Sequence, residues 1–119
     1  MGVTFVDVVI RKSSRSRHAE TVECLVDSGA HYSAIPFTTL KKLGIRPIGK
    51  RSFILADGSK IEREMAPAFF EFEGRSAAST AICGEEGDAT LLGVITLEEL
   101  GLMLDPLKRE LRQLPLLLM

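Results

Sequence analysis

The sequence predicts an all-β domain, a closed or nearly closed barrel with one or two short helices. Short runs rich in Val, Ile, Phe and Thr recur from one end of the chain to the other. Turn residues, above all Gly and Asp, separate these runs. Only two segments carry helical signals, and no internal repeat is present. Many short strands with few helices indicate a mainly β sheet closed upon itself.

The composition is that of one ordinary domain. The chain has 119 residues, enough for one core and too few for two, so we expect a single domain spanning residues 1–119. Fifteen basic and sixteen acidic residues give a net charge of −1, so no overall field would attract nucleic acid or an acidic membrane.

The sequence also indicates where the protein resides. No apolar stretch approaches the ~20 residues that span a bilayer, and the N-terminus lacks a secretory pattern. Cys24 and Cys83 are far apart in the sequence and form no CxxC motif. The pattern therefore predicts two buried thiols in a reducing compartment. We therefore expect a cytoplasmic protein without membrane contact.

The first half of the chain predicts a hairpin that leads to an aspartate. Residues 3–10 are rich in Val, Phe and Ile, and residues 21–26 form a second strand that ends at Asp27. The basic stretch 11–18 between them indicates a solvated loop. Residues 36–43 then carry apolar side chains at helical spacing between a proline and a glycine, which predicts a short helix.

The middle of the chain predicts two further hairpins. Residues 51–55 and 60–65 flank Ala56-Asp57-Gly58-Ser59, where Asp-Gly indicates a tight two-residue turn with a positive φ at Gly58. Residues 68–72 and 76–83 flank a second turn at 73–75, and residues 84–88 form a polar loop.

The last third predicts a short strand, a helix and a hairpin. Residues 90–93 are apolar and end in glycine. Thr96 and Glu99 match a capping box, so a helix is expected to begin at Thr96 and to end near Gly101. Residues 102–114, with Asp105-Pro106 between apolar runs, are expected to form the last hairpin.

The motif Asp27-Ser28-Gly29-Ala30 carries the most chemical information. An apolar run ends there in a carboxylate, a hydroxyl and a glycine, so the carboxylate is expected where a buried strand meets a turn. A carboxylate fixed beside amide donors and a hydroxyl is placed for acid–base work. The alternative is an Asp-Ser-Gly turn that only closes the strand.

The order of three features resembles the retropepsin-like aspartic proteases. These features are Asp27-Ser28-Gly29-Ala30, then Ala56-Asp57-Gly58, then Leu91-Leu92-Gly93 before a helix. These proteases are the single-domain relatives of pepsin. The resemblance covers nearly the whole chain and implies a closed acid-protease-type barrel, one lobe of a pepsin-like fold. It also implies an aspartic endopeptidase that needs no metal and no cofactor.

The resemblance assigns roles to particular residues. Asp27 would be the catalytic carboxylate, Ser28 would hydrogen-bond across to the partner's loop, and Gly29 would give a backbone N–H to the carboxylate. Structural support of this loop would come from Ser33, Leu91, Leu92 and Gly93. Substrate would contact Ala30, His31, Tyr32 and, at the tip of a closing flap, Ala56, Asp57 and Gly58. His31 and Tyr32 stand where viral members carry acidic residues, so viral-type specificity is not expected.

A single Asp-Ser-Gly implies a homodimer. Aspartic proteases place two carboxylates around one water, and like charges so close share one proton. None of Asp57, Asp88 and Asp105 follows a buried strand as Asp27 does, so the second Asp27 would come from a twofold-related copy acting on a peptide or protein substrate. The apolar residues 114–119 would lie either against that copy or on their own barrel.

Other functions remain open at this point. The chain could form a retropepsin-like dimer that binds a peptide or protein without cutting it. A metal site could combine Asp27, His31 and His18, although no HxxxH or Cys/His cluster accompanies them. Cys24 is a poor candidate nucleophile, because a thiol inside an apolar strand stays protonated.

Overall fold

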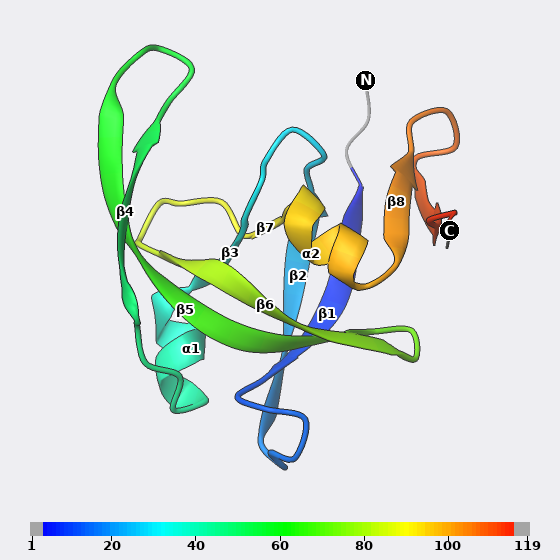
Figure 1. Cartoon of the computed structure of the whole chain (residues 1–119), viewed down its shortest axis with the longest axis horizontal. Helices are drawn as coiled ribbons and strands as arrows, with labels where there is room; N and C mark the ends of the chain where they lie inside the picture. Colours follow the sequence, from blue (N-terminus) through cyan, green and yellow to red (C-terminus); the bar gives the residue numbers. More distant parts are fainter. Residues whose placement is uncertain (1–3, 116–119) are drawn as a thin grey trace, which may run out of the picture.

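Within residues 4–115, which the computed structural model describes, seven strands form one curved sheet and two more form a separate hairpin (Figure 1). The helices are α1 (Phe37–Lys42) and α2 (Val94–Glu99). The strands are β1 (Phe5–Arg11), β2 (Ala19–Val26), β3 (Ser33–Pro36), β4 (Gly49–Ile54), β5 (Lys60–Phe72), β6 (Arg75–Gly84), β7 (Leu91–Leu92), β8 (Leu102–Asp105) and β9 (Glu110–Gln113). The predicted mainly β class with two short helices is confirmed.

The large sheet curls back on itself. Its strand order is β1-β2-β7-β3-β6-β5-β4, and β5 also pairs with β1 over three residue pairs, from Val9↔Glu71 to Arg11↔Phe69. Strand β4 lies outside this ring, paired with β5 at the edge of the sheet. The barrel is therefore not strictly closed, and the hairpin of β4 and β5 extends beyond it (Figure 1).

Alternating side chains of the strands fill the barrel. In β1, Val8 and Ile10 are fully buried while Asp7 points to solvent, as period-two alternation predicts. Helices α1 and α2 cover the barrel with Leu40 and Leu97. Together these side chains form one apolar core, whose largest members are Phe70, Ile10, Ile35, Leu40, Leu92 and Leu97.

Strand β5 is longer than predicted. The sequence indicated two strands interrupted near Pro67, whereas β5 runs through this proline, which pairs with Thr80 of β6. On its other edge, β5 pairs with β4 up to Met65 and with β1 from Phe69 onward. Pro67 lies between these two partners, so its missing N–H removes no hydrogen bond on that edge.

The predicted capping box at Thr96 is wrong. Helix α2 begins at Val94 with Gly93 as its N-cap, and no side chain caps it. Thr96 lies inside the helix and is fully buried, and its hydroxyl contacts Ser33 Oγ at 2.6 Å and Ser79 Oγ at 3.0 Å. The hydroxyl has partners in the core and is not available to cap. The helix ends as predicted, before Gly101 with a φ of +74°.

The β4–β5 turn is partly as predicted. Gly58 has a φ of +87°, but its N–H donates to the carbonyl of Leu55 at 2.9 Å. Ala56 and Asp57 are therefore the central residues of the turn, and Gly58 follows them. A left-handed glycine after such a turn suits a hairpin with a bulge and not the expected two-residue loop.

Both ends of the described chain are hydrogen-bonded to the stretch of residues 101–109. The hydroxyl of Thr4 donates to the carbonyl of Arg109 at 2.9 Å, and Leu114 N–H donates to the carbonyl of Gly101 at 2.8 Å. Residues 116–119, for which a contact with a partner was predicted, lie outside the described residues. Neither helix found between residues 4 and 115 has the length and apolar composition needed to cross a bilayer.

The buried hydroxyl of Thr96 should stabilise the fold measurably. Thr96→Val keeps the side-chain shape but removes the partner of two buried serines, so the free energy of unfolding should fall by about 1–3 kcal/mol. Thr38→Val, at an exposed position of α1, is the control and should change it by less than about 0.5 kcal/mol. Urea unfolding of both variants makes the comparison, and equal small effects would contradict a stabilising role for the Thr96 hydroxyl.

Candidate active site

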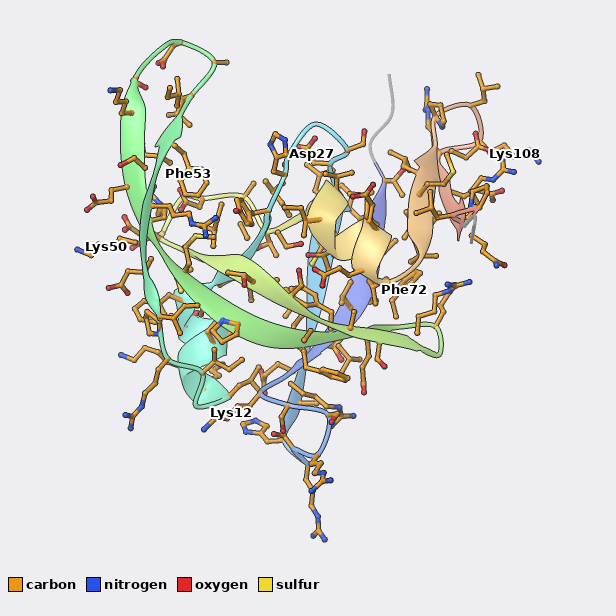
Figure 2. All side chains as sticks on the ribbon, in the orientation of Figure 1. Lys12, Asp27, Lys50, Phe53, Phe72 and Lys108 are labelled. Atoms are coloured by element: carbon orange, nitrogen blue, oxygen red, sulfur yellow. The ribbon has the colours of Figure 1, made fainter. Side chains whose placement is uncertain are left out.

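Asp27 lies where β2 leaves the sheet. The end of β2 is paired in parallel with β7 through Leu25↔Leu91 and Val26↔Leu92. The N–H of Leu25 donates to Thr90 O at 2.9 Å, and the N–H of Asp27 donates to Leu92 O at 3.1 Å. Figure 2 shows the labelled Asp27 in the loop between β2 and β3, which we call the Asp27 loop (residues 27–32). The backbone of Asp27 is thus fixed by the strand beside it.

The Asp27 side chain is held by its own loop. The side-chain Oδ1 accepts a hydrogen bond from Gly29 N–H at 2.9 Å. The backbone carbonyl of Asp27 accepts one from Ala30 N–H at 3.1 Å. Asp27 is half-buried, whereas Ser28 and Gly29 are exposed. The carboxylate is therefore oriented by a backbone donor and remains partly accessible to solvent.

The Asp27 loop also begins helix α2. The N–H groups of Val94 and Ile95 have no intrahelical acceptor, as at the start of any helix. They donate instead to the carbonyls of Ala30 at 2.8 Å and His31 at 3.0 Å. The loop and the helix therefore satisfy each other's backbone groups, which explains why no side-chain cap is needed.

Gly93 permits the close contact between these two segments. A Cβ added at Gly93 would lie 2.5 Å from both the carbonyl carbon and oxygen of Tyr32, so another residue could not occupy this position without moving the loop. The N–H of Gly93 donates to Ser33 Oγ at 2.9 Å. The structure thus places the predicted supporting residues directly beside the loop that carries Asp27.

The predicted site residues form two groups in the structure. The first group lies around the β2, β3 and β7 ends and contains Asp27, Ser28, Gly29, Ala30, His31, Tyr32, Ser33, Leu91, Leu92 and Gly93. The second group, Ala56, Asp57 and Gly58, is exposed at the tip of the β4–β5 hairpin. Hydrogen bonds from Ser59 hold the Asp57 carboxylate and lower its pKa.

Side chains of β4 connect the two groups, which the sequence did not reveal. The Arg51 guanidinium lies over the Tyr32 ring, 5.3 Å from its centroid, and donates a hydrogen bond to its hydroxyl. Phe53 meets the same ring edge-on, with centroids 6.1 Å apart. No pattern in the sequence indicated these contacts, because strand periodicity does not show which loop an exposed side chain reaches.

Two other aspartates, Asp88 and Asp105, already have hydrogen-bond partners. Asp88 binds Arg63 through two hydrogen bonds of 2.7 and 2.9 Å, which lower the pKa of this carboxyl. Asp105 accepts from the N–H groups of Lys108 and Leu107 and from Arg112, and these bonds lower its pKa. Within residues 4–115, none of these aspartates hydrogen-bonds to Asp27.

The metal and thiol alternatives are not supported. His18 contacts Glu20 at 3.1 Å and precedes β2, so the length of an eight-residue strand separates it from Asp27. Between residues 4 and 115, no group of three or more His, Cys, Asp or Glu residues could hold a metal ion. Burial raises the pKa of Cys24 to about 12, so this thiol stays protonated and is a poor nucleophile.

Comparison with known proteins supports the fold. No protein-family model matches the sequence, and no curated protein matches it either. Among solved structures, the chain is similar to the EIAV protease complexed with the inhibitor HBY-793. The two share 20% sequence identity with a TM-score of 0.66, over 84% of this chain and 89% of that one. The predicted retropepsin-like fold is therefore confirmed, and at this level of identity the likeness concerns the fold alone.

The contact at Gly93 predicts an unusually sensitive glycine. Gly93→Ala should lower the free energy of unfolding by about 1–3 kcal/mol or more, because its Cβ would overlap the Tyr32 carbonyl. Gly49→Ala is the control, since nothing lies within 4 Å of a Cβ at that position. Thermal unfolding measures both variants, and an equal loss in the two would show that the Gly93 contact does not constrain the loop.

Proposed function

We propose that the protein is an aspartic endopeptidase that hydrolyses peptide bonds as a homodimer. The observation that carries this proposal is the Asp27 carboxylate, which accepts a hydrogen bond from Gly29 at the end of a strand buried in the sheet. The fold supports it, because the similar solved structure is that of a protease complexed with an inhibitor. The reaction requires neither a metal nor a cofactor.

Two copies of Asp27 would divide the chemistry between them. When two carboxylates flank one water, they share a proton, because both cannot ionise at so short a distance. The ionised carboxylate takes a proton from the water as it attacks the peptide carbonyl, and the protonated one gives its proton to the carbonyl oxygen.

The second copy is required because the chain offers one suitable carboxylate. Asp88 and Asp105 already bind arginines, and Asp57 lies at the tip of the hairpin. A twofold-related subunit would supply its own Asp27, and the exposed Ser28 would hydrogen-bond across to the partner loop.

A peptide substrate would lie between the Asp27 loop and the hairpin tip. Ala30, His31 and Tyr32 would contact it from below, and Ala56, Asp57 and Gly58 from above. Closure of the hairpin would exclude water from the carboxylates. His31 and Tyr32 replace acidic residues of viral members, so the preferred peptide would differ from theirs.

Asp27→Asn should reduce peptide hydrolysis by at least about 100-fold, because the amide cannot accept and return a proton. Asp7→Asn is the control, since Asp7 is exposed on β1 opposite Glu23. Both variants and the wild type are assayed with a peptide library from acidic to neutral pH. Activity of Asp27→Asn within about tenfold of wild type would sink the assignment. If the wild type binds peptides but cuts none, the protein is a non-cleaving binding module.

The shared pair predicts an effect of mixing. Equal amounts of wild type and Asp27→Asn are mixed and allowed to exchange subunits. The activity should fall to about half of its value before exchange, because half of the wild-type subunits are then in mixed dimers that hold one functional aspartate. Analytical ultracentrifugation at the assay concentration confirms that dimers are present. Unchanged activity after exchange would show that one Asp27 is enough and would exclude the shared mechanism.

A further inference from the structure

The ion pair of Arg63 and Asp88 joins the β4–β5 hairpin to the loop between β6 and β7. Arg63 lies on β5, in the stretch paired with β4, and Asp88 lies in the loop between β6 and β7. The guanidinium contacts both carboxylate oxygens, at 2.7 and 2.9 Å, and approaches Glu85 to within 3.6 Å. The Arg63 side chain is only 15% exposed, so the pair is shielded from solvent on that side.

The β4–β5 hairpin has little other attachment to the body at this level. We call β4, the turn 55–59 and residues 60–65 the flap. Five of the six residues of β4 are exposed, and Ile54 and Leu55 near the turn are 73% and 43% exposed. Strand β5 pairs with β6 only from Met65 onward, so Arg63 lies beyond the point where the flap leaves the barrel. Its position therefore depends on side-chain contacts.

The loop that holds Asp88 leads directly to the support of Asp27. Asp88 also accepts a hydrogen bond from Glu85 N–H at 2.9 Å, which fixes the turn of this loop. Two residues later, Thr90 O accepts from Leu25 N–H, and Leu92 O accepts from Asp27 N–H. Only a short segment of backbone therefore separates Asp88 from the residue whose carbonyl accepts the Asp27 N–H.

The other strand of the flap has a tie of its own. Arg51 and Phe53 of β4 both contact Tyr32, the last residue of the Asp27 loop. Figure 2 shows the labelled Phe53 on β4, at the same end of the molecule as Asp27. The flap therefore contacts the Asp27 loop through β4 and the loop 85–90 through β5.

We propose that Arg63 and Asp88 are positioning residues. Their contact holds the flap at a fixed height above Asp27, and it holds the loop 85–90 in place beneath the flap. This inference rests on the proposed peptidase function. In the intact protein the pair keeps the closing segment registered with the carboxylate, so that a bound peptide meets both. When the pair is broken, the flap opens more widely. Catalytic efficiency then falls mainly because the substrate binds more weakly.

The test uses Arg63→Gln, Asp88→Asn, the double variant and Arg63→Lys, with Arg11→Gln as the matched control. Arg11 pairs with Glu71 at 3.0 Å across β1 and β5, away from the flap. Hydrogen exchange is measured for residues 49–65 and 85–92, and KM and kcat are measured with a peptide substrate. Exchange needs no activity, so it reports on the coupling even if no peptide is cut.

Arg63→Gln should raise exchange in both segments and raise KM by about tenfold, with a smaller change in kcat. Adding Asp88→Asn should change little more, and Arg63→Lys should restore part of the loss, because a single charge replaces a two-bond contact. Arg11→Gln should leave both segments unchanged. Additive effects, exchange confined to one segment, or the same response in Arg11→Gln would overturn the inference. Coupled exchange without hydrolysis in any variant would leave the positioning intact and reject the peptidase proposal.

Discussion

The absence of a side chain at Gly93 is the constraint on which the candidate site depends. Because no Cβ stands there, the backbone of Tyr32 can lie against the start of α2. Once the two segments touch, the loop carbonyls accept the first helical N–H groups, and Ser33 Oγ accepts from Gly93. Residues 60 positions apart in the chain are joined in this way. The Asp27 loop is thus held on the side that faces β7 and α2, whereas Ser28 and Gly29 remain exposed.

Asp27 differs from Asp88 and Asp105 in having no arginine partner among the described residues. The hydrogen bonds from Arg63 lower the pKa of Asp88, and the backbone N–H groups of Lys108 and Leu107, with Arg112, lower the pKa of Asp105. Asp27 receives one backbone N–H and no arginine among the described residues. In the proposed homodimer, this carboxylate would face the Asp27 of the second copy.

Local patterns in the sequence were sufficient for most of the fold. Alternation in β1 and β2 and the glycines at 58, 74 and 101 located the strands and turns, because each signal depends on neighbouring residues. Thr96 misled the prediction because a capping box and a buried threonine look alike in sequence. Its hydroxyl meets Ser33 and Ser79, and contacts so distant along the chain leave no local pattern. The Asp27 motif was predictable, but its dependence on Gly93 packing required the structure.

The length of β5 explains why the flap contacts escaped the sequence and why they matter. One continuous strand serves the barrel over residues 65–72 and the flap over residues 60–65, so no sequence boundary marks where the function changes. In the barrel part, β6 pairs with one edge of the strand over residues 65–72, and β1 pairs with the other edge over residues 69–71. In the flap part, β4 is an exposed edge strand and supplies little apolar burial. Arg63 lies just beyond the last residue of β5 that pairs with β6, and this position is the reason for our proposal that its contact with Asp88 holds the free end of the strand.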